Sequence, residues 1–221
     1  MLDVVLATLF LVILAPLLVV IAVAIKLDSR GPVLYRCRRA GRHGAEFGML
    51  KFRKMYDGAD GPALSAAHDA RFTRVGRVLA RAKLDEIPQL LNVLLGQMSV
   101  VGPRPEDPFF VALAPAKFAT VLEVQPGITG LSQLAFARES EILDPADRVG
   151  HYVQAILPQK LALDTLYATK RSIRMDLLIL GWTALAVLGR RDVAVNRENG
   201  KLTRRVRKQV QQPLVESSQA A

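Results

Sequence analysis

The most uniform pattern lies at the start of the chain, where residues 2–25 are apolar except at Asp3, Thr8 and Pro16. This run exceeds the ~18–20 residues that a helix needs to cross the hydrocarbon core of a bilayer. A cleaved signal peptide is not expected, because the run has neither a basic segment before it nor a small-residue cleavage motif after it. The pattern therefore predicts a membrane helix over residues 1–26.

Pro16 lies near the middle of this helix and leaves two arrangements open. A straight span would place the N-terminus outside and the following basic residues in the cytoplasm. These are Lys26, Arg30, Arg36, Arg38, Arg39 and Arg42. A re-entrant hairpin would break at Pro16, because an internal proline removes a backbone hydrogen bond and clashes with the preceding turn. Prolines also occur in ordinary transmembrane helices. In both arrangements the rest of the chain lies on the cytoplasmic face.

Residues 27–56 have a pattern that is typical of a β-hairpin. Gly31-Pro32 makes a turn, residues 33–35 form one short strand, and residues 47–52 form its partner. The following segment, 57–70, is rich in Gly, Ala, Ser and Asp and predicts a loop. We therefore expect only a small β-hairpin beside the helices that follow.

Residues 71–83 predict an amphipathic helix. Its apolar stripe contains Phe72, Val75, Leu79 and Ala82, and its other side carries Arg71, Arg74, Arg77 and Arg81. A basic face is often simply solvated. Beside a membrane anchor, however, it is typical of a helix that lies on anionic lipid headgroups. We expect this helix at the membrane interface.

Further helices are predicted over residues 84–95, 109–122, 144–167 and 173–188. The last of them is apolar nearly all round, so it packs in the core or against lipid. Residues 191–221 are basic and then polar, which predicts a partly disordered tail. The expected fold class is α+β and predominantly α-helical, with the membrane helix, amphipathic interfacial helices and the small hairpin around a cytoplasmic domain at residues 27–190.

Composition narrows the kinds of partner. The net charge of +10 calls for an acidic partner, such as nucleic acid, anionic lipid or a phosphorylated substrate. The chain has no helix-turn-helix, zinc finger or aromatic-basic sheet motif, so nucleic acid is not expected. Cys37 is the single cysteine, which excludes an internal disulfide and fits a reducing cytoplasm.

Residues 84–105 are the most informative segment for chemistry. Asp85 and Glu86 open the apolar helical stretch, and Gly102-Pro103-Arg104-Pro105 closes the segment. We expect Asp85 to be the N-cap and Pro88 to lie in the first turn. Both carboxylates then lie at the positive end of a helix, where phosphate groups are favoured. A capped core helix would explain the Asp-Glu pair alone, but not the whole segment.

The segment closely resembles the catalytic segment of the bacterial sugar transferases, the monotopic polyprenol-phosphate phosphoglycosyltransferases. Lys51-Phe52-Arg53-Lys54-Met55 is similar to the family's Lys-Phe-Arg-Ser/Thr-Met element. Residues 126–133 match the family's Pro-Gly-Ile-Thr-Gly-Trp-x-Gln box except at Leu131. The spacing of the family's C-terminal signature is kept by Asp164, Tyr167, Ser172, Asp176 and Thr183. The similarity covers the chain from about residue 2 to about residue 190.

This resemblance implies the transfer of a sugar phosphate from a nucleoside diphosphate sugar, expected to be a UDP-sugar, to polyprenol (undecaprenyl) phosphate. UMP is released, and the reaction initiates polysaccharide (exopolysaccharide) or glycoconjugate synthesis. The resemblance makes Asp85 the nucleophile, through an aspartyl-phospho-sugar, and Glu86 the neighbour that holds a metal ion. Two carboxylates beside substrate phosphates suit Mg²⁺, with Mn²⁺ as the alternative.

The resemblance also implies positions for the remaining site residues. Arg104 is the leading phosphate ligand, because phosphoryl transfer depends on positioning and charge neutralisation. Lys51 and Arg53 are further phosphate ligands or support the loop between the strand and the membrane. The family pattern implies substrate-side roles for Asp164 and Tyr167. The membrane helix becomes re-entrant in the bacterial inner membrane, with residues 27–190 as a catalytic domain on the cytoplasmic face.

Two departures from the family pattern bear on these expectations. The usual Ser-Pro break is Ala15-Pro16 here, so a hydroxyl that could satisfy the freed carbonyl is lost. The Asn-Gly-Arg that often follows the glutamine box is absent, and Arg138 stands one place beyond the expected arginine. Arg138 either takes over an anion contact in a rebuilt loop, or the contact is lost.

A second class of function is a membrane-anchored, non-catalytic scaffold that binds anionic lipid or a partner enzyme. The intact Asp85-Glu86 pair and Arg104 argue against a dead scaffold. The expected partners are a nucleoside diphosphate sugar, polyprenol phosphate and anionic membrane lipids, with no nucleic acid. A homo-oligomer is left open.

Overall fold

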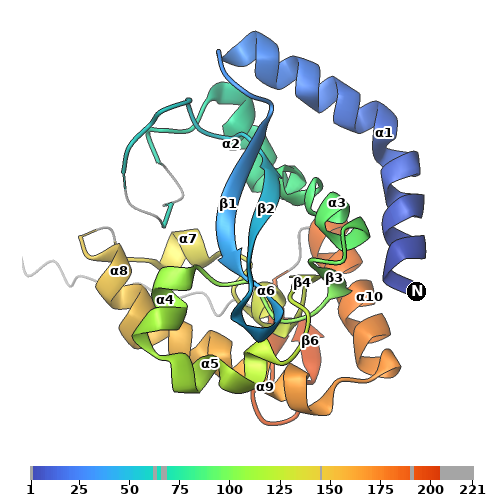
Figure 1. The fold of residues 1–221 in the computed structure, drawn as a ribbon, viewed down its shortest axis with the longest axis vertical. Coiled ribbons are helices and arrows are strands. Elements are labelled where there is room, and N and C mark those ends of the chain that lie inside the picture. Colours follow the sequence, from blue (N-terminus) through green and yellow to red (C-terminus); the bar gives the residue numbers. More distant parts are fainter. Residues whose placement is uncertain (1, 62–63, 66–68, 145, 190–191, 205–221) are drawn as a thin grey trace, which may run out of the picture.

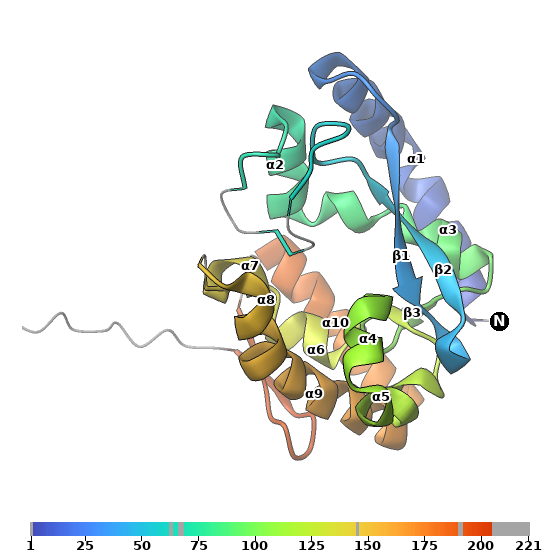
Figure 2. The same cartoon turned by 60° about the vertical axis from the view of Figure 1, so that its left-hand side comes forward.

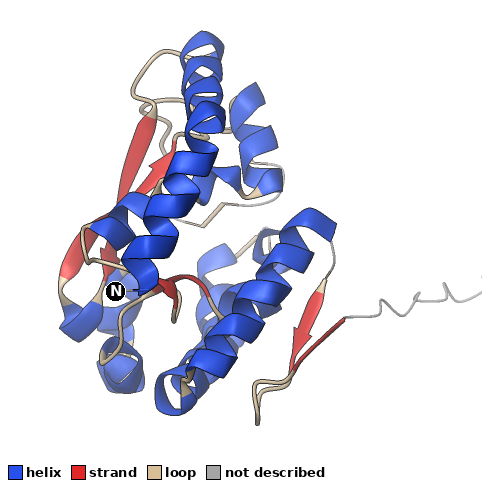
Figure 3. Ribbon diagram, turned by 90° about the vertical axis from the view of Figure 1, so that its right-hand side faces the viewer, coloured by secondary structure: helices blue, strands red, loops and turns tan. Residues whose placement is uncertain are grey.

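Helices dominate the protein, and its strands are confined to small sheets (Figures 1 and 3). The computed structural model describes residues 2–204 except 62–63, 66–68, 145 and 190–191. The helices are α1 (Leu2–Asp28), α2 (Arg74–Ala82), α3 (Gln89–Leu94), α4 (Pro108–Leu113), α5 (Pro115–Leu122), α6 (Leu131–Ala135), α7 (Glu139–Ile142), α8 (Arg148–His151), α9 (Leu157–Lys170) and α10 (Ile173–Gly189). Shorter helical turns lie at Arg42–Gly44, Leu84–Glu86 and Tyr152–Ile156. The predicted class, α+β with mostly helix, is confirmed in outline.

Within the described residues, the strands form three two-stranded sheets. They are β1 (Leu34–Ala40) with β2 (Glu46–Phe52), β3 (Ser99–Val101) with β4 (Gly127–Thr129), and β5 (Val193–Val195) with β6 (Leu202–Arg204). The β1–β2 hairpin is antiparallel and confirms the predicted hairpin, with Tyr35 opposite Lys51. The β3–β4 pair is parallel and joins segments far apart in the sequence.

The N-terminal helix α1 is continuous through Pro16, and its axis changes direction about halfway along (Figure 1). Among the described helices, it is the one long and apolar enough to cross a membrane, judged by length and composition alone. Both of its ends are tied to the rest of the protein. The Ser99 hydroxyl donates to Asp3 over 2.9 Å, and the Val75 N–H donates to Asp28 over 2.9 Å. The expected break at Pro16 is thus a bend within one helix.

The hydrophobic core consists of three clusters of buried side chains. The main cluster joins α3, β3, α6, α9 and α10, and a second lies between α4, α5 and α9. The third packs Ile21 and Ile25 of α1 against Phe52 of β2 and Leu79 of α2. Figure 2 shows the resulting arrangement, with α1, α2 and the β1–β2 hairpin on one side and α4 to α9 on the other.

Several predicted helix boundaries are wrong, and each has a local cause. The helix expected from residue 84 begins at Gln89 instead, with Pro88 at its N-cap, so Asp85 is not the cap. Lys83 ends α2 in the left-handed conformation, with φ 58°, and sends the chain into a 3₁₀ turn. The helix predicted over 109–122 is divided before Pro115, since proline cannot continue a helix.

Residues 193–204, which the sequence places in the C-terminal tail, contain the β5–β6 hairpin. The side chain of Val193 is buried in the main core cluster, and Leu202 packs against it. This hairpin was not predicted. The predicted disorder of the tail concerns mostly residues 205–221, which lie outside the described residues.

Candidate active site

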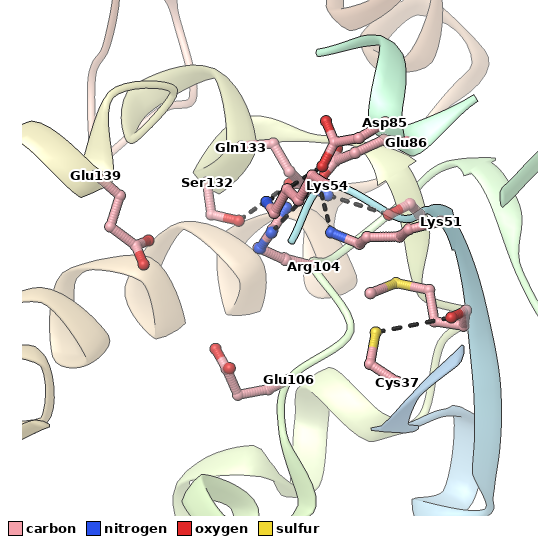
Figure 4. Close-up of polar contacts among 12 residues, drawn as sticks. Cys37, Lys51, Lys54, Asp85, Glu86, Arg104, Glu106, Ser132, Gln133 and Glu139 are labelled. Carbon is pink, nitrogen blue, oxygen red and sulfur yellow. Dashed lines mark hydrogen bonds and ion pairs between the residues drawn. The ribbon is translucent and has the colours of Figure 1, made fainter. Parts of the chain in front are cut away.

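The adjacent acids Asp85 and Glu86 lie in the 3₁₀ turn between α2 and α3. Their side chains differ in burial, since Asp85 is 3% exposed and Glu86 is 20% exposed. A nearly buried carboxylate requires compensating positive charge. Basic side chains provide this compensation, and Figure 4 shows Lys51, Lys54 and Arg104 around the two acids.

Each acid is paired with lysine or arginine. Lys54 Nζ lies 3.2 Å from Asp85 Oδ2. Lys51 Nζ lies 2.8 Å from Glu86 Oε1, and an Arg104 guanidinium nitrogen lies 3.6 Å from the same oxygen. The charge of Lys83 also interacts with both carboxylates. The structure therefore brings four of the predicted site residues together, namely Asp85, Glu86, Lys51 and Arg104.

The lysines are held in place by contacts between β2, α3 and α2. Asn92 of α3 is buried, and its Oδ1 accepts from the Leu50 N–H over 2.9 Å, directly before Lys51. After the strand, the Thr73 N–H donates to the Lys54 carbonyl over 3.1 Å. A Cβ on Gly76 would come within 1.9 Å of the same carbonyl oxygen, so α2 can approach only because glycine stands there.

Arg104 projects from a turn that is fixed by the parallel β3–β4 pair. The Gly102 N–H donates to Thr129 over 2.9 Å, and the Gly127 N–H donates to Pro103 over 2.8 Å. A Cβ on Gly127 would lie 2.0 Å from the Gly102 nitrogen, so no larger residue fits there. Gln133 is the last residue of the box at residues 126–133. Its side chain donates to the carbonyls of Gly102 and Gly127 and so connects the two strands. The box therefore supports the backbone at the base of Arg104.

The cluster stabilises the ionised forms of Glu86 and Arg104. Burial alone would raise the pKa of Glu86, but the charges of Lys51, Arg104 and Lys83 lower it well below its usual range. Burial alone would lower the pKa of Arg104, but Glu86 and then Glu139 and Glu106 raise it. Glu86 is therefore an anion at neutral pH and a hard oxygen ligand.

A second polar cluster lies beyond Arg104 and is more deeply buried. Lys160 of α9 is 3% exposed, and its Nζ lies 2.9 Å from Glu139 Oε2 and 2.7 Å from the Tyr152 hydroxyl. The Tyr152 hydroxyl donates to Glu106 over 2.5 Å. Glu106 and Glu139 flank Arg104 on the side away from Glu86 (Figure 4).

Asp164 is buried beside this second cluster. The Ser132 side chain and the backbone N–H of Arg104 interact with its carboxyl and lower its pKa, while its Oδ1 has no hydrogen-bond partner in the described part of the chain. Burial raises the pKa of Asp164 to about 7 against these contacts and the charge of Lys160. The substrate-side role expected for Asp164 stays a prediction, and its carboxyl lies beside the backbone of Arg104.

Three other predicted residues lie away from the acids. The Arg53 guanidinium donates to the carbonyls of Ser29 and Arg30, so it holds the loop that follows α1. Arg138 pairs with Asp192 over 2.9 Å and with Glu141 over 3.6 Å. The Tyr167 hydroxyl donates to Asp176 over 2.7 Å and connects α9 to α10. These contacts hold the fold, and the structure does not bring the three residues to Asp85.

Sequence reasoning missed several residues of the two clusters. Lys54 stands in the Lys-Phe-Arg-Ser/Thr-Met element at the Ser/Thr position, and this departure was a usable signal. Lys83 directly precedes the catalytic segment, and Glu106 directly follows its last proline. Glu139 and Lys160 come together only through the packing of α7 on α9, so their spacing gave no signal.

The side chains available as metal ligands decide whether a metal ion fits beside Asp85 and Glu86. Within the described residues, no group of three or more His, Cys, Asp and Glu side chains converges on one point. Mg²⁺ needs fewer protein ligands than that, since it commonly binds one or two carboxylates together with waters and substrate phosphates. Asp85 and Glu86 therefore fit Mg²⁺ as a partial site that substrate phosphates complete.

Comparison with known proteins agrees with this geometry. Residues 1–190 match the family described as bacterial sugar transferase. The UDP-glucose:undecaprenyl-phosphate glucose-1-phosphate transferase of Caulobacter vibrioides is 42% identical over 85% of this chain and 68% of its own length. The undecaprenyl-phosphate glucose phosphotransferase of Komagataeibacter xylinus is 40% identical over 80% of this chain. The exopolysaccharide production protein PSS of Rhizobium leguminosarum is 38% identical over 81% of this chain and 90% of its own length.

The share of each relative that is covered differs widely, because the chain spans only 33% of the Komagataeibacter xylinus protein. The residues of this chain that match the family, 1–190, include the acids, the lysines at the end of β2 and Arg104. From the match over residues 1–190 and from these relatives, the chain belongs to the bacterial sugar transferase family.

Proposed function

We propose that this protein transfers a sugar phosphate from a UDP-sugar to undecaprenyl phosphate and releases UMP. The observation that supports this most directly is the adjacent pair of acids, in which the buried Asp85 pairs with Lys54 and Glu86 pairs with Lys51 and Arg104. Several relatives carry UDP-glucose in their names, and one carries UDP-N-acetylgalactosamine. UDP-glucose is therefore the first donor to test.

The chemistry consists of two displacements at one phosphorus atom. An Asp85 carboxylate oxygen bonds to the sugar-bearing phosphorus, the bond from that phosphorus to the bridging oxygen breaks, and UMP leaves with the electron pair. An oxygen of the lipid phosphate then attacks the same phosphorus and restores the Asp85 carboxylate.

The other residues of the cluster bind and orient the diphosphate. Arg104 presents a planar set of donors suited to phosphate oxygens, and Lys51 fixes Glu86. A divalent ion held by Glu86 and Asp85 would neutralise charge on the phosphate oxygens. Because Mg²⁺ favours such oxygen ligands, activity is expected to need Mg²⁺ or Mn²⁺ and to be lost in excess EDTA.

We propose that α1 enters and leaves the inner membrane through its cytoplasmic leaflet, with the bend at Pro16 inside. Both ends of α1 hydrogen-bond to the same folded unit, through Asp3 at one end and Asp28 at the other. A straight span would separate these two contacts across the bilayer. The exposed apolar residues between them, such as Val12 and Val19, are then available to lipid.

The topology can be tested with one engineered thiol. In a Cys37→Ala background, a cysteine placed next to Met1 is expected to resist a membrane-impermeant thiol reagent added to whole cells. Ready labelling from outside the cell would establish a full span. Pro16→Ala restores a backbone donor and removes the ring clash, so it is expected to straighten α1 and increase labelling.

The activity is tested with purified protein in nanodiscs that contain undecaprenyl phosphate, with Mg²⁺ and a panel of UDP-sugars. The expected result is UMP release with at least one donor and formation of a lipid-linked sugar phosphate. A non-catalytic scaffold predicts no UMP release with any donor. That result, with folded protein and a broad panel, would contradict the proposed function.

A further inference from the structure

Lys54 is the residue that covers the candidate nucleophile. Its ammonium group lies 3.2 Å from Asp85, and its side chain is 27% exposed while that of Asp85 is 3% exposed. Lys54 therefore lies on the open side of a nearly buried carboxylate. In the motif that the chain otherwise keeps, serine or threonine stands at this position, and neither carries a charge.

The position of Lys54 is set by the backbone and is not a chance arrangement of a surface lysine. Its carbonyl accepts the Thr73 N–H over 3.1 Å, and Gly76 lets α2 lie against the same carbonyl. The next residue, Met55, pairs with Phe72 in an isolated β-bridge. The ammonium group also lies 5.7 Å from the centre of the Phe72 ring, a second contact that limits its freedom.

The charges around the acids make Lys54 important for what can bind. Asp85 and Glu86 carry two negative charges, and the basic residues that interact with them are Lys51, Lys54, Lys83 and Arg104. A divalent cation that arrives alone meets this surplus of positive charge and must displace Lys54 from Asp85. A diphosphate brings negative charge and gives the Lys54 ammonium group new oxygen partners.

We propose that Lys54 is a positioning residue that pairs with Asp85 until a diphosphate arrives, so that the divalent cation and the diphosphate enter the site together. This inference rests on the proposed function of the same site. It adds an order of binding. Lys54 orients Asp85, and then releases it when phosphate oxygens replace Asp85 as the partner of the ammonium group.

The test measures binding of Mn²⁺ to the full chain in nanodiscs by electron paramagnetic resonance, without nucleotide and with UDP. Mn²⁺–UDP formed in protein-free samples is subtracted. The wild-type protein is expected to bind Mn²⁺ at least about ten-fold more tightly with UDP than alone. Lys54→Thr, which installs the motif residue, is expected to bind Mn²⁺ alone at least about five-fold more tightly than wild type.

Three further variants make the result specific. Lys54→Gln removes the charge with similar reach and serves if the threonine variant does not fold. Lys54→Arg keeps the charge and is expected to behave like wild type. Lys117→Thr makes the same change at an exposed lysine on α5 and is expected to leave Mn²⁺ binding unchanged.

Tighter Mn²⁺ binding without UDP separates this role from a structural one, since a damaged site would bind the ion more weakly. The inference is overturned if folded Lys54→Thr and Lys54→Gln bind Mn²⁺ alone within about two-fold of wild type while wild type releases UMP. Absence of UMP release by wild type with every UDP-sugar would instead contradict the proposed function.

Discussion

The two polar clusters on either side of Arg104 have opposite charge balances. Around Asp85 and Glu86, positive side chains outnumber the carboxylates, and Lys54 and Arg104 are partly exposed. Around Lys160, one buried ammonium group pairs with both Glu106 and Glu139 and also donates to the Tyr152 hydroxyl. Arg104 interacts electrostatically with the carboxylates of both clusters.

Under the proposed function, this difference separates the residues expected to contact substrate from the residues that position them. A surplus of partly exposed positive charge attracts a diphosphate, whereas a buried and mutually paired network offers little to a ligand. The cluster around Lys160 instead fixes the carboxylates that flank Arg104. Substitutions in the first cluster should therefore change catalysis, and substitutions in the second should change stability first.

The largest effect is expected from Asp85→Asn. The amide keeps the shape of the side chain but cannot act as an anionic nucleophile, so UMP release should fall by about 10⁴-fold or more. The matched control is Asp60→Asn, which changes an exposed aspartate and should leave the rate unchanged. UMP release near the wild-type rate in a folded Asp85→Asn protein would remove the covalent mechanism and the contrast between the clusters.

The next effect concerns stability, through Lys160→Met. The change leaves Glu106 and Glu139 without their buried cation, which should cost about 3–5 kcal/mol of the free energy of unfolding. Lys170→Met, at an exposed lysine near the end of the same helix, is the control. Thermal unfolding in detergent measures both. If Lys160→Met unfolds like wild type but releases UMP slowly, the second cluster belongs to the substrate site.

The sequence predicted the parts of the fold that depend on local pattern. A turn signal and two short strand-like runs identified the β1–β2 hairpin, and the apolar and basic faces identified α2. The long apolar helix α10 also lies where it was predicted. In each case neighbouring residues carry the signal, because the element forms its hydrogen bonds within itself or with the adjacent strand.

The parts that depend on distant contacts were not predictable. The β3–β4 pair has only three residues on each strand, and it forms because Gly102 and Gly127 permit close contact. Arg104 was found from its motif, but its flanking carboxylates were not, since Glu139 reaches the cluster through a pairing with Lys160 that no sequence spacing reveals. For Arg138 the sequence left open whether it contacts an anion or the contact is lost, and the structure pairs its guanidinium with Asp192.

A smaller effect is expected from Arg104→Lys, which tests the residue between the clusters. Lysine keeps the charge but loses the planar set of donors, so kcat/KM for the UDP-sugar should fall by about 10- to 100-fold. Arg36→Lys, at an exposed arginine of β1, is the control. Stability should change little, because the positive charge beside Glu86 remains. A large loss of thermal stability with normal kcat/KM would make Arg104 a structural residue.

The smallest effect should come from Asp164→Asn, and it should depend on pH. Burial raises the pKa of Asp164 from its ordinary 3.8 to about 7 in the folded protein, so the folded state binds the proton more tightly than the unfolded state. This group therefore costs stability as the pH rises from about 4 to about 7, and no further cost is added above that range. Asparagine stays neutral and keeps an oxygen beside Ser132 and the backbone N–H of Arg104. Relative to wild type, the variant should gain about 2–3 kcal/mol of stability between pH 5 and pH 8. Thermal unfolding of both proteins at several pH values measures the difference in stability between variant and wild type. The contributions of the other titrating groups are the same in both proteins and cancel in this difference. A constant difference across this range would show that Asp164 is ionised throughout and compensated by Lys160, and the second cluster would then be fully paired.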